Sequence, residues 1–151
     1  MITRHPKWHL QLEEFLLDRK SVPFAWGSND CALFAADAIL SMTGTDLASE
    51  FRGKYSTQLG AMKLITQVVP GGSTLEDAAA HCTSVHGLTE YTHPLMAKRG
   101  DLVVVDNAGA NIAGVIHLNG TQAVSVSEDG ILLLPILDSA GKPALVRAWS
   151  V

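Results

Sequence analysis

The thiol of Cys31 is the side chain of this sequence best suited to covalent chemistry. It follows a tryptophan, a glycine and three turn-forming polar residues in the stretch 24–34, FAWGSNDCALF, and it precedes an apolar helical pattern. A cysteine in the first turn of a helix lies among unpaired backbone N–H groups and at the positive end of the helix dipole, which favours the thiolate and lowers its pKa. The pattern therefore predicts a nucleophile, and the same N–H groups are placed to stabilise an oxyanion.

The residues before this thiol shape its turn. Asp30 and Asn29 are good helix caps, and Gly27 permits a sharp backbone turn beneath Trp26. The same stretch is also typical of a structural cysteine, because cysteine is among the most readily buried residue types and a neighbouring cap only starts a helix. The residues by themselves leave both interpretations open.

The first half of the sequence predicts helices. Apolar residues recur at helical spacing from Trp8 to Leu16, and a second helix is expected from Asp30 or Cys31 to Thr43-Gly44. A third helix is expected over 59–69. A fourth, capped by Thr74 or Ser73, should run to His81.

The second half predicts strands. Five β-rich runs, with a loop at 107–111, indicate an antiparallel meander over 101–106, 112–118, 121–127, 130–135 and 144–150. Asn119-Gly120 and Asp129-Gly130 mark two hairpin turns, the first with two residues. The order predicts an α+β fold with the helices on one side of the sheet. We expect a single domain over 1–151: an N-terminal helix in 1–22, a helical half in 23–95 and the meander in 96–151.

Length, charge and cysteine content narrow the class of protein. A chain of 151 residues that is 47% hydrophobic is long enough to bury one core. Its net charge of -4, without a basic stripe, argues against nucleic acid as a partner. No apolar segment approaches the length of a membrane span, so we expect a soluble protein made in the cytosol. The two cysteines, Cys31 and Cys82, are expected to be reduced thiols.

Four stretches of this sequence together resemble a known group. They are PFAWGSNDCALFAADAILSMTG, FRGKY, RGDLVVVD and a carboxy-terminal AW, and they extend from Pro23 to Trp149. They are similar to the NlpC-type cysteine peptidases, papain-like enzymes that cut peptidoglycan stem peptides. They resemble more closely a family of small phage and prophage tail-associated proteins related to those enzymes. The resemblance implies a papain-like NlpC-type fold in which Cys31 descends from a catalytic cysteine and Trp26, Gly27 and Asp30 shape the site.

The histidine of those enzymes has no counterpart here. It opens the strand after Gly-Asp-Leu-Val, where it faces the cysteine, and the matching position in this sequence is near Ile112. His117 lies five residues further, roughly 17 Å along an extended strand, and its side chain points to the opposite face. We expect His117 to pair with Gln122 on a polar hairpin face.

The other titratable residues predict no second site. His93, in a loop before Pro94, is a weak candidate for a base. The pattern H-C-x3-H at 81–86 lacks the paired spacings of a structural zinc site, so no metal and no cofactor are expected. His5 and His9 are expected at the surface, and Asp37 in a structural network.

Two functions follow from the resemblance. The first is a structural component of a phage tail tip or baseplate, built on a degenerate peptidase fold and located in the virion tail after synthesis in the host cytoplasm. Its partners would be other tail proteins, with the apolar run Ile131 to Leu137 in need of cover. The alternative is an active cysteine peptidase that cuts peptidoglycan during phage entry, using His93, His117 or a partner chain. A domain that binds muropeptide without cutting it is a third hypothesis.

Overall fold

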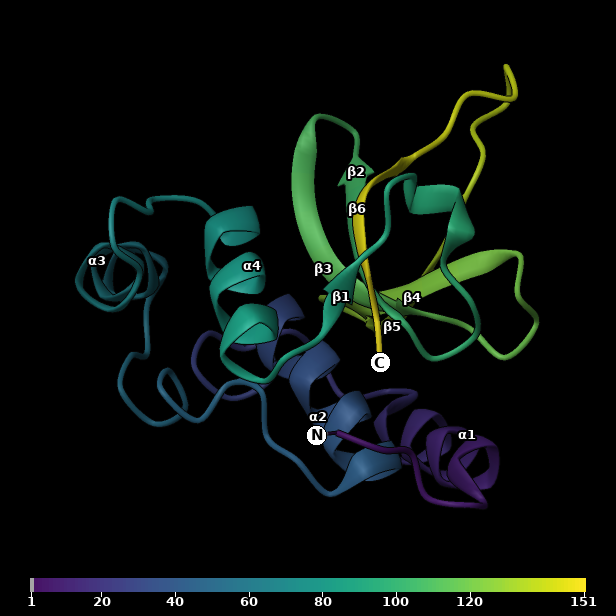
Figure 1. The fold of residues 1–151 in the computed structure, drawn as a ribbon, viewed down its shortest axis with the longest axis horizontal. Helices are drawn as coiled ribbons and strands as arrows, with labels where there is room; N and C mark the ends of the chain where they lie inside the picture. Colours follow the sequence, from purple (N-terminus) through teal and green to yellow (C-terminus); the bar gives the residue numbers. More distant parts are fainter. Residues whose placement is uncertain (1) are drawn as a thin grey trace.

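Three of the four α-helices cover one face of an antiparallel sheet. The computed structural model describes residues 2–151, and Figure 1 shows the sheet beside α1, α2 and α4, with α3 set apart at the left. The helices are α1 (Trp8–Arg19), α2 (Cys31–Thr43), α3 (Gln58–Val68) and α4 (Leu75–Val85), with a short 3-10 helix, η1 (Pro94–Met96). The four expected helices and the α+β class are confirmed.

Local sequence signals set the ends of the helices. The Asp30 carboxylate accepts the Leu33 N–H over 2.9 Å and caps α2, which ends at Gly44 with φ of 75°. Thr74 and Asp77 form the expected capping box at the start of α4. These elements follow directly from residues adjacent in the sequence.

The sheet has six strands rather than the expected five. They are β1 (Thr89–Glu90), β2 (Leu102–Asn107), β3 (Ala110–Ile116), β4 (Gln122–Ser127), β5 (Gly130–Pro135) and β6 (Leu145–Ser150), in the order β1-β6-β2-β3-β4-β5. Strands β2 to β5 form the expected meander. The final strand departs from it, because β6 returns to pair with β2. The sixth strand, β1, lies in the segment expected to be helical and pairs with β6.

Two turns differ from their predicted lengths. The expected loop at 107–111 is a tight turn of Ala108 and Gly109, with Asn107 paired to Ala110, so β3 begins two residues early. The turn at Asn119-Gly120 is longer than two residues, because β3 ends at 116 and β4 starts at 122. The expected pairing at its base holds, since the His117 N–H donates to the Gln122 carbonyl over 2.8 Å.

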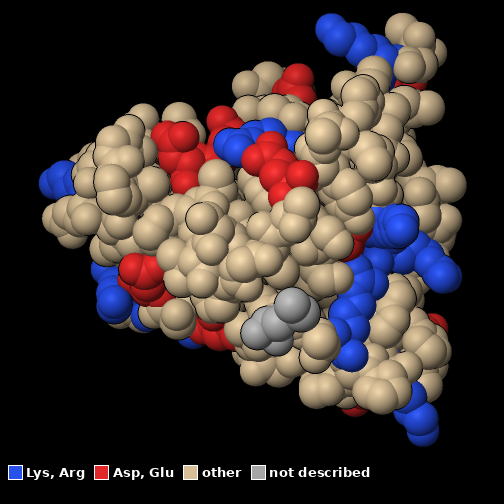
Figure 2. Space-filling model, in the orientation of Figure 1, with Lys and Arg blue, Asp and Glu red and all other residues tan. Residues whose placement is uncertain are grey.

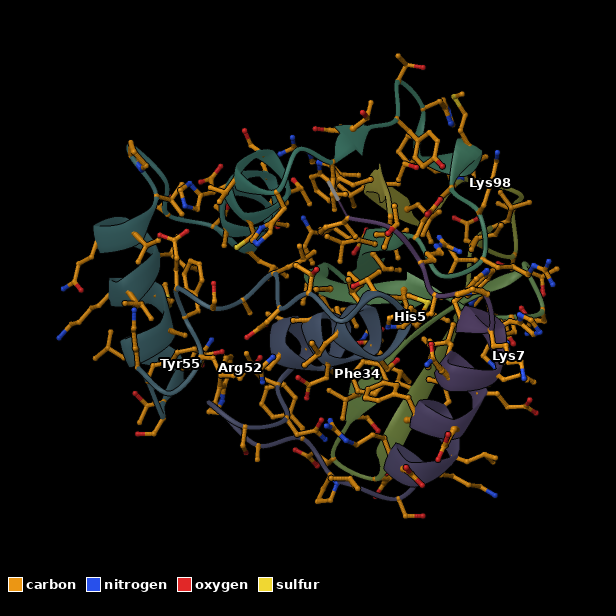
Figure 3. All side chains as sticks on the ribbon, turned by 60° about the horizontal axis from the view of Figure 1, so that its bottom comes forward. His5, Lys7, Phe34, Arg52, Tyr55 and Lys98 are labelled. Carbon is orange, nitrogen blue, oxygen red and sulfur yellow. The ribbon has the colours of Figure 1, made fainter. Side chains whose placement is uncertain are left out.

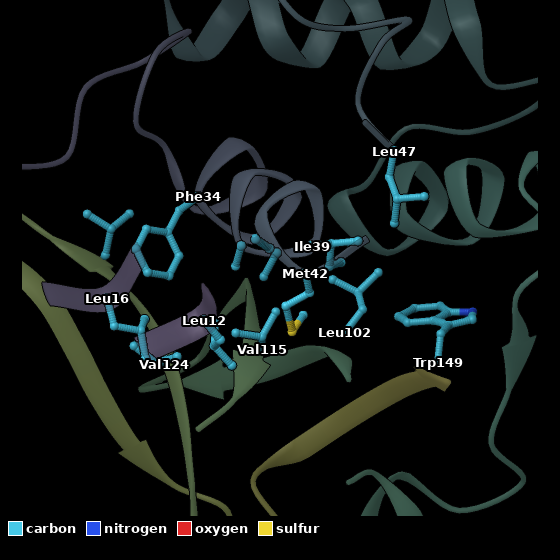
Figure 4. Packing of buried hydrophobic residues seen from close by; sticks show 14 of the residues in the cluster. Leu12, Leu16, Phe34, Ile39, Met42, Leu47, Leu102, Val115, Val124 and Trp149 are labelled. Carbon is cyan, nitrogen blue, oxygen red and sulfur yellow. The ribbon is translucent and has the colours of Figure 1, made fainter. Parts of the chain in front are cut away.

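The main core lies between the sheet and the helices. Figure 4 shows this cluster, to which α1 and α2 contribute residues from successive turns and the strands contribute every second residue. Its labelled members are Leu12, Leu16, Phe34, Ile39, Met42, Leu47, Leu102, Val115, Val124 and Trp149. The cluster fixes the position of α2 against β3.

The opposite face of the sheet has a smaller core. Its buried members are Val103, Val105, Ile116, Ala123, Leu145 and Ala148. The chain covers this face with irregular segments, including Tyr91 and Ala97 before β2 and Ile136 and Ala144 in the β5–β6 connection. The α-helices α1, α2 and α4 therefore cover one face of the sheet, as expected, and the short 3-10 helix η1 belongs to the stretch that covers the other face.

Candidate functional site

Cys31 is the first residue of α2 and faces the beginning of β3. Its side chain packs against the main core and borders a cavity of about 560 Å³. The cavity lies between α2, α3, α4, the loop before α3 and the first residues of β3. Trp26, 41% exposed and stacked edge-to-face on Phe24, lies on the same cavity wall. The expected position of the thiol at a helix start, next to a cleft, is confirmed.

A buried carboxylate orders the turn in front of the thiol. Asp30 is 1% exposed, and besides capping α2 it accepts the Gly27 N–H over 3.0 Å and the Tyr55 hydroxyl over 2.5 Å. Asn29 is also buried, where its side-chain amide donates to the carbonyls of Val22 and Pro23. Both polar side chains directly before Cys31 are thus hydrogen-bonded to the surrounding chain, and the Asp30 carboxylate has three donors.

The FRGKY segment joins this turn to α2. Arg52 forms salt bridges with Asp37 at 2.7 Å and with Asp46 at 2.8 Å, while Arg19 of α1 binds Asp37 at 2.8 Å. Figure 3 shows Arg52 and Tyr55 on the same side of the molecule, near α3 and α2. The network role expected for Asp37 is confirmed. Tyr55 and Arg52 were not identified as site residues from the sequence, although FRGKY belongs to the quoted motif.

Burial raises the pKa of Cys31, whereas the sequence predicts a lowered pKa. The loss of solvent raises the thiol pKa to about 11, and the neighbouring Asp30 carboxylate adds to this shift. Hydrogen bonds from the backbone of Ala113 and Ala32 act in the opposite direction and are weaker. The lowering of the pKa expected from the helix end is therefore outweighed. A thiolate in an apolar site loses more hydration free energy than its interaction with the helix N-terminus provides.

Cys82 shares both the cavity and the shift. It borders the cavity from α4, and burial raises its pKa to about 11, with Glu50 and Asp46 adding to the effect. Both cysteines are free thiols, as expected. The two thiols therefore have similar acidities, so a helix start does not set Cys31 apart.

The residue of β3 that faces the thiol is Ala113, one position from the predicted Ile112. Ala113 belongs to the main core and its backbone hydrogen-bonds Cys31, whereas Ile112 packs against the cluster on the other face. Successive strand residues point to opposite faces, so Asn111 shares the face of Ala113. Asn111 borders the cavity, as do its neighbours Ala110 and Ile112, so it is the packing of Ile112 against the other cluster that separates the two positions. The position that faces Cys31 is therefore corrected from Ile112 to Ala113, with Asn111 next on that face.

Neither candidate base borders this cavity. His117 lies in the β3–β4 loop, about 13 Å along the strand from Ala113, where its Nδ1 accepts the Asn119 N–H over 3.0 Å. His93 precedes η1, and its Nδ1 accepts the Leu95 N–H over 3.1 Å. Within residues 2–151 no histidine lines the cavity. The structure thus does not bring His117 or His93 to Cys31.

The remaining histidines have local partners or lie in solvent. His81 hydrogen-bonds Glu50 at 2.9 Å, and His86 hydrogen-bonds the Cys82 carbonyl at 2.9 Å. His5 and His9 are exposed, as expected. In the described part of the chain, no three His, Cys, Asp or Glu side chains are grouped to hold a metal ion.

The Gly-Asp-Leu-Val motif supplies a structural anchor. Asp101 is 1% exposed and accepts hydrogen bonds from Arg4, the Tyr91 hydroxyl and the backbone N–H groups of Lys98 and Val151. The carboxylate thus ties both ends of the chain to the start of β2. Its role was not predicted, because its partners are distant in sequence.

A basic hollow lies beside this anchor, away from the thiol. It is lined by Arg4, Lys98 and Arg99 around the Trp8 ring. Figure 2 shows Lys and Arg side chains gathered on the right of the molecular face in view. Arg4 stacks over Trp8 at 4.2 Å. Figure 3 shows Lys98 far from Arg52 and Tyr55. The sequence did not reveal this grouping, because Arg4 and Lys98 are far apart along the chain.

Over residues 2–151 the structure contains no helix of the length and apolar character that crossing a bilayer requires.

Comparisons with known proteins give a family and no activity. No curated protein matches the chain in a sequence comparison. A family described as a domain of unknown function, DUF6950, matches residues 3–151. Because this match includes nearly every residue, the chain belongs to the DUF6950 family.

Proposed function

We propose that this protein is a structural component of a phage tail tip or baseplate, built on a degenerate papain-like, NlpC-type peptidase fold. The observation that carries the non-catalytic part of the proposal is the wall opposite Cys31. There the facing side chain is the methyl group of Ala113, and no histidine of residues 2–151 borders the shared cavity. The location in a phage tail is supported by the resemblance of the WGSNDC, FRGKY and RGDLVVVD stretches to small tail-associated proteins.

The chemistry of the thiol also favours a non-catalytic role. With its pKa raised to about 11, Cys31 is almost wholly protonated at neutral pH. Amide hydrolysis needs a group that removes the thiol proton and later protonates the departing amine, and such assistance contributes about 10²- to 10⁴-fold. The neutral thiol of Cys31 faces Ala113, and alanine can neither remove the thiol proton nor protonate the departing amine.

The exposed edge of the sheet supports an assembly role. Strand β5 forms one edge of the sheet. Leu133 within this strand and Leu137 just after it are each 44% exposed. Leu134, in contrast, packs against the second cluster. An apolar edge of this kind suits burial against another protein chain.

Purified sacculi test the non-catalytic part. Wild-type protein and Cys31→Ala are incubated with sacculi, and released stem peptides are quantified by mass spectrometry. The proposal expects no release above the Cys31→Ala background. Cleavage that depends on Cys31 would instead establish the alternative, an active peptidoglycan peptidase, and would require a base from His93, His117 or another chain.

Incorporation into particles tests the tail role. The protein should be detected in purified tails, and Leu133→Asp should reduce its incorporation at least tenfold while its unfolding free energy stays within about 1 kcal/mol of wild type. Leu134→Asp is the matched control for core damage, with a cost of about 3 kcal/mol or more because a charge enters the second cluster. Absence of the wild-type protein from purified tails would overturn the tail assignment.

A further inference from the structure

The cavity beside Cys31 is bordered by several elements, is open to solvent on one side and is mostly apolar. Its volume of about 560 Å³ lies within the range of roughly 300–1,000 Å³ typical of small-molecule sites. Half of the lining residues belong to the helices α2, α3 and α4. Its larger apolar side chains include Leu33, Ile39, Phe51, Met62, Ile65 and Leu75. Such a wall stabilises a ligand by removing apolar surface from water.

The charged side chain that borders this cavity is already hydrogen-bonded. Among the described residues, Asp30 is the single charged side chain that borders the cavity, and it already accepts from Gly27, Leu33 and Tyr55. Thr74 at the other end accepts the Asp77 N–H in its capping box. An anionic group inside the cavity would find no opposite charge, and a cationic group would find only Asp30, which already has three donors, so the desolvation of either group would cost several kcal/mol. Charged peptides are therefore poor ligands for this cavity.

Helix α3 closes one side of the cavity and is loosely held. Ala61, Met62 and Ile65 line the cavity, yet none of the α3 side chains is buried. Figure 1 shows α3 separated from the sheet by α4. A helix with so little buried surface can move away at low cost, because few apolar contacts hold it in place. Access to the cavity through this side needs no change in the core.

We propose that this cavity binds a single uncharged aliphatic chain, the apolar part of an amphiphile such as a fatty alcohol or an acyl lipid. The apolar wall selects the chain, and a polar end group stays in water at the opening. Binding is non-covalent. It is a property of the isolated protein and does not depend on the tail assignment.

Displacement of a neutral fluorescent probe tests this site. The protein is saturated with N-phenyl-1-naphthylamine, and 1-hexanol, 1-octanol, 1-decanol and 1-dodecanol are titrated as competitors. Each added methylene should tighten binding about fourfold, which corresponds to about 0.8 kcal/mol of apolar burial, until the chain fills the cavity. The short peptide Ala-Glu-Lys-Ala should not displace the probe.

A cavity-filling variant locates the binding. Ala61→Phe puts a ring into the cavity from α3 and should weaken decanol binding at least tenfold, whereas Lys63→Phe adds the same ring to an exposed position of the same helix and should leave it unchanged. Ala78→Leu on α4 is a second filling variant that does not depend on α3. Circular dichroism and melting curves establish that each variant is folded.

Three results would overturn the proposal. One is equal alcohol affinity in wild type and both folded filling variants, which would place the alcohols outside the cavity. Another is a folded wild-type protein that binds no alcohol of the series, which would make apolar side chains of a partner chain the better occupant. The third is displacement of the probe by the charged peptide at the concentrations effective for decanol, which would contradict an apolar site.

Discussion

The Tyr55 hydroxyl donates a 2.5 Å hydrogen bond to the buried carboxylate of Asp30, across 25 positions of sequence. This bond joins the FRGKY segment to the turn that starts α2. Burial and the hydrogen bond to Asp30 raise the pKa of Tyr55, so the hydroxyl remains a donor throughout the physiological range. The position of Cys31 thus depends on a residue outside its own motif.

Removing this hydroxyl should destabilise the fold without changing its shape. Tyr55→Phe leaves Asp30 with its two backbone donors, and a hydrogen bond to a charged group contributes roughly 1.5–3 kcal/mol. Urea denaturation should show a loss in this range. Ser56→Ala, at the exposed neighbouring position, should change the unfolding free energy by less than about 0.5 kcal/mol. Equal effects of the two substitutions would show that the bond is not stabilising.

Gly27 should be needed for a close approach as well as for its backbone angle. Its φ is 81°, and a Cβ at this position would lie 2.2 Å from the Tyr55 carbonyl oxygen. Gly53 has nearly the same φ, 77°, with no atom within 4 Å of its Cβ position. Gly53→Ala should therefore cost only the left-handed backbone strain, about 1–2 kcal/mol. Gly27→Ala should cost at least about 2 kcal/mol more, because the 51–55 segment must shift.

Calorimetric melting of both variants measures this difference. Similar losses of stability for Gly27→Ala and Gly53→Ala would mean that the close contact relaxes without cost. A larger loss for Gly27→Ala, accompanied by faster proteolysis near Tyr55, would agree with a displaced segment.

Stability should fall in alkaline solution because the partial burial of both thiols raises their pKa. The pKa of each cysteine rises from 9.0 to about 11 on folding, so the folded state holds its thiol protons more tightly than the unfolded state. The stabilisation is complete below pH 9 and is lost as the pH rises toward 11, by at most about 1.4 kcal/mol per pH unit for each cysteine. Urea denaturation at pH 8 and pH 10.5 should show this decrease.

The variant that carries both Cys31→Ala and Cys82→Ala isolates the thiol contribution. Lysine and tyrosine titrations are common to both proteins, so the difference between their pH profiles belongs to the cysteines. Parallel pH profiles for wild type and the double variant would contradict a raised pKa of the two thiols.

A histidine at Asn111 should activate Cys31, and one at Ile112 should not. Both residues border the cavity, but Asn111 lies on the strand face of Ala113, whereas the Ile112 side chain packs with the second cluster. An imidazolium near the thiol favours the thiolate and lowers the thiol pKa. Asn111→His should therefore raise the rate of Cys31 alkylation by iodoacetamide at pH 7 at least tenfold. Ile112→His is the matched control, and equal rates in the two variants would refute the assigned strand face.

Neighbouring residues determined much of this fold. Asp30 caps α2 through an N–H three residues away, Thr74 and Asp77 cap α4 in the same way, and the strand pattern after Gly100 needs only alternation and turns. Such features are set by local hydrogen bonds and by side-chain periodicity, so the sequence was enough to predict them. The position of Cys31 at a helix start was predictable for the same reason.

The acidity of the site and its facing residues depended on tertiary structure. The sequence predicts a low thiol pKa from the helix end, but burial against β3 and the charge of Asp30 raise it. The turn at Ala108-Gly109 moves the start of β3, and only the packed sheet shows that Ala113 faces the thiol. The place of β6 beside β2 and the bond from Tyr55 to Asp30 join residues far apart in sequence. Desolvation, register and long-range contacts arise when the elements pack, so no local pattern encodes them.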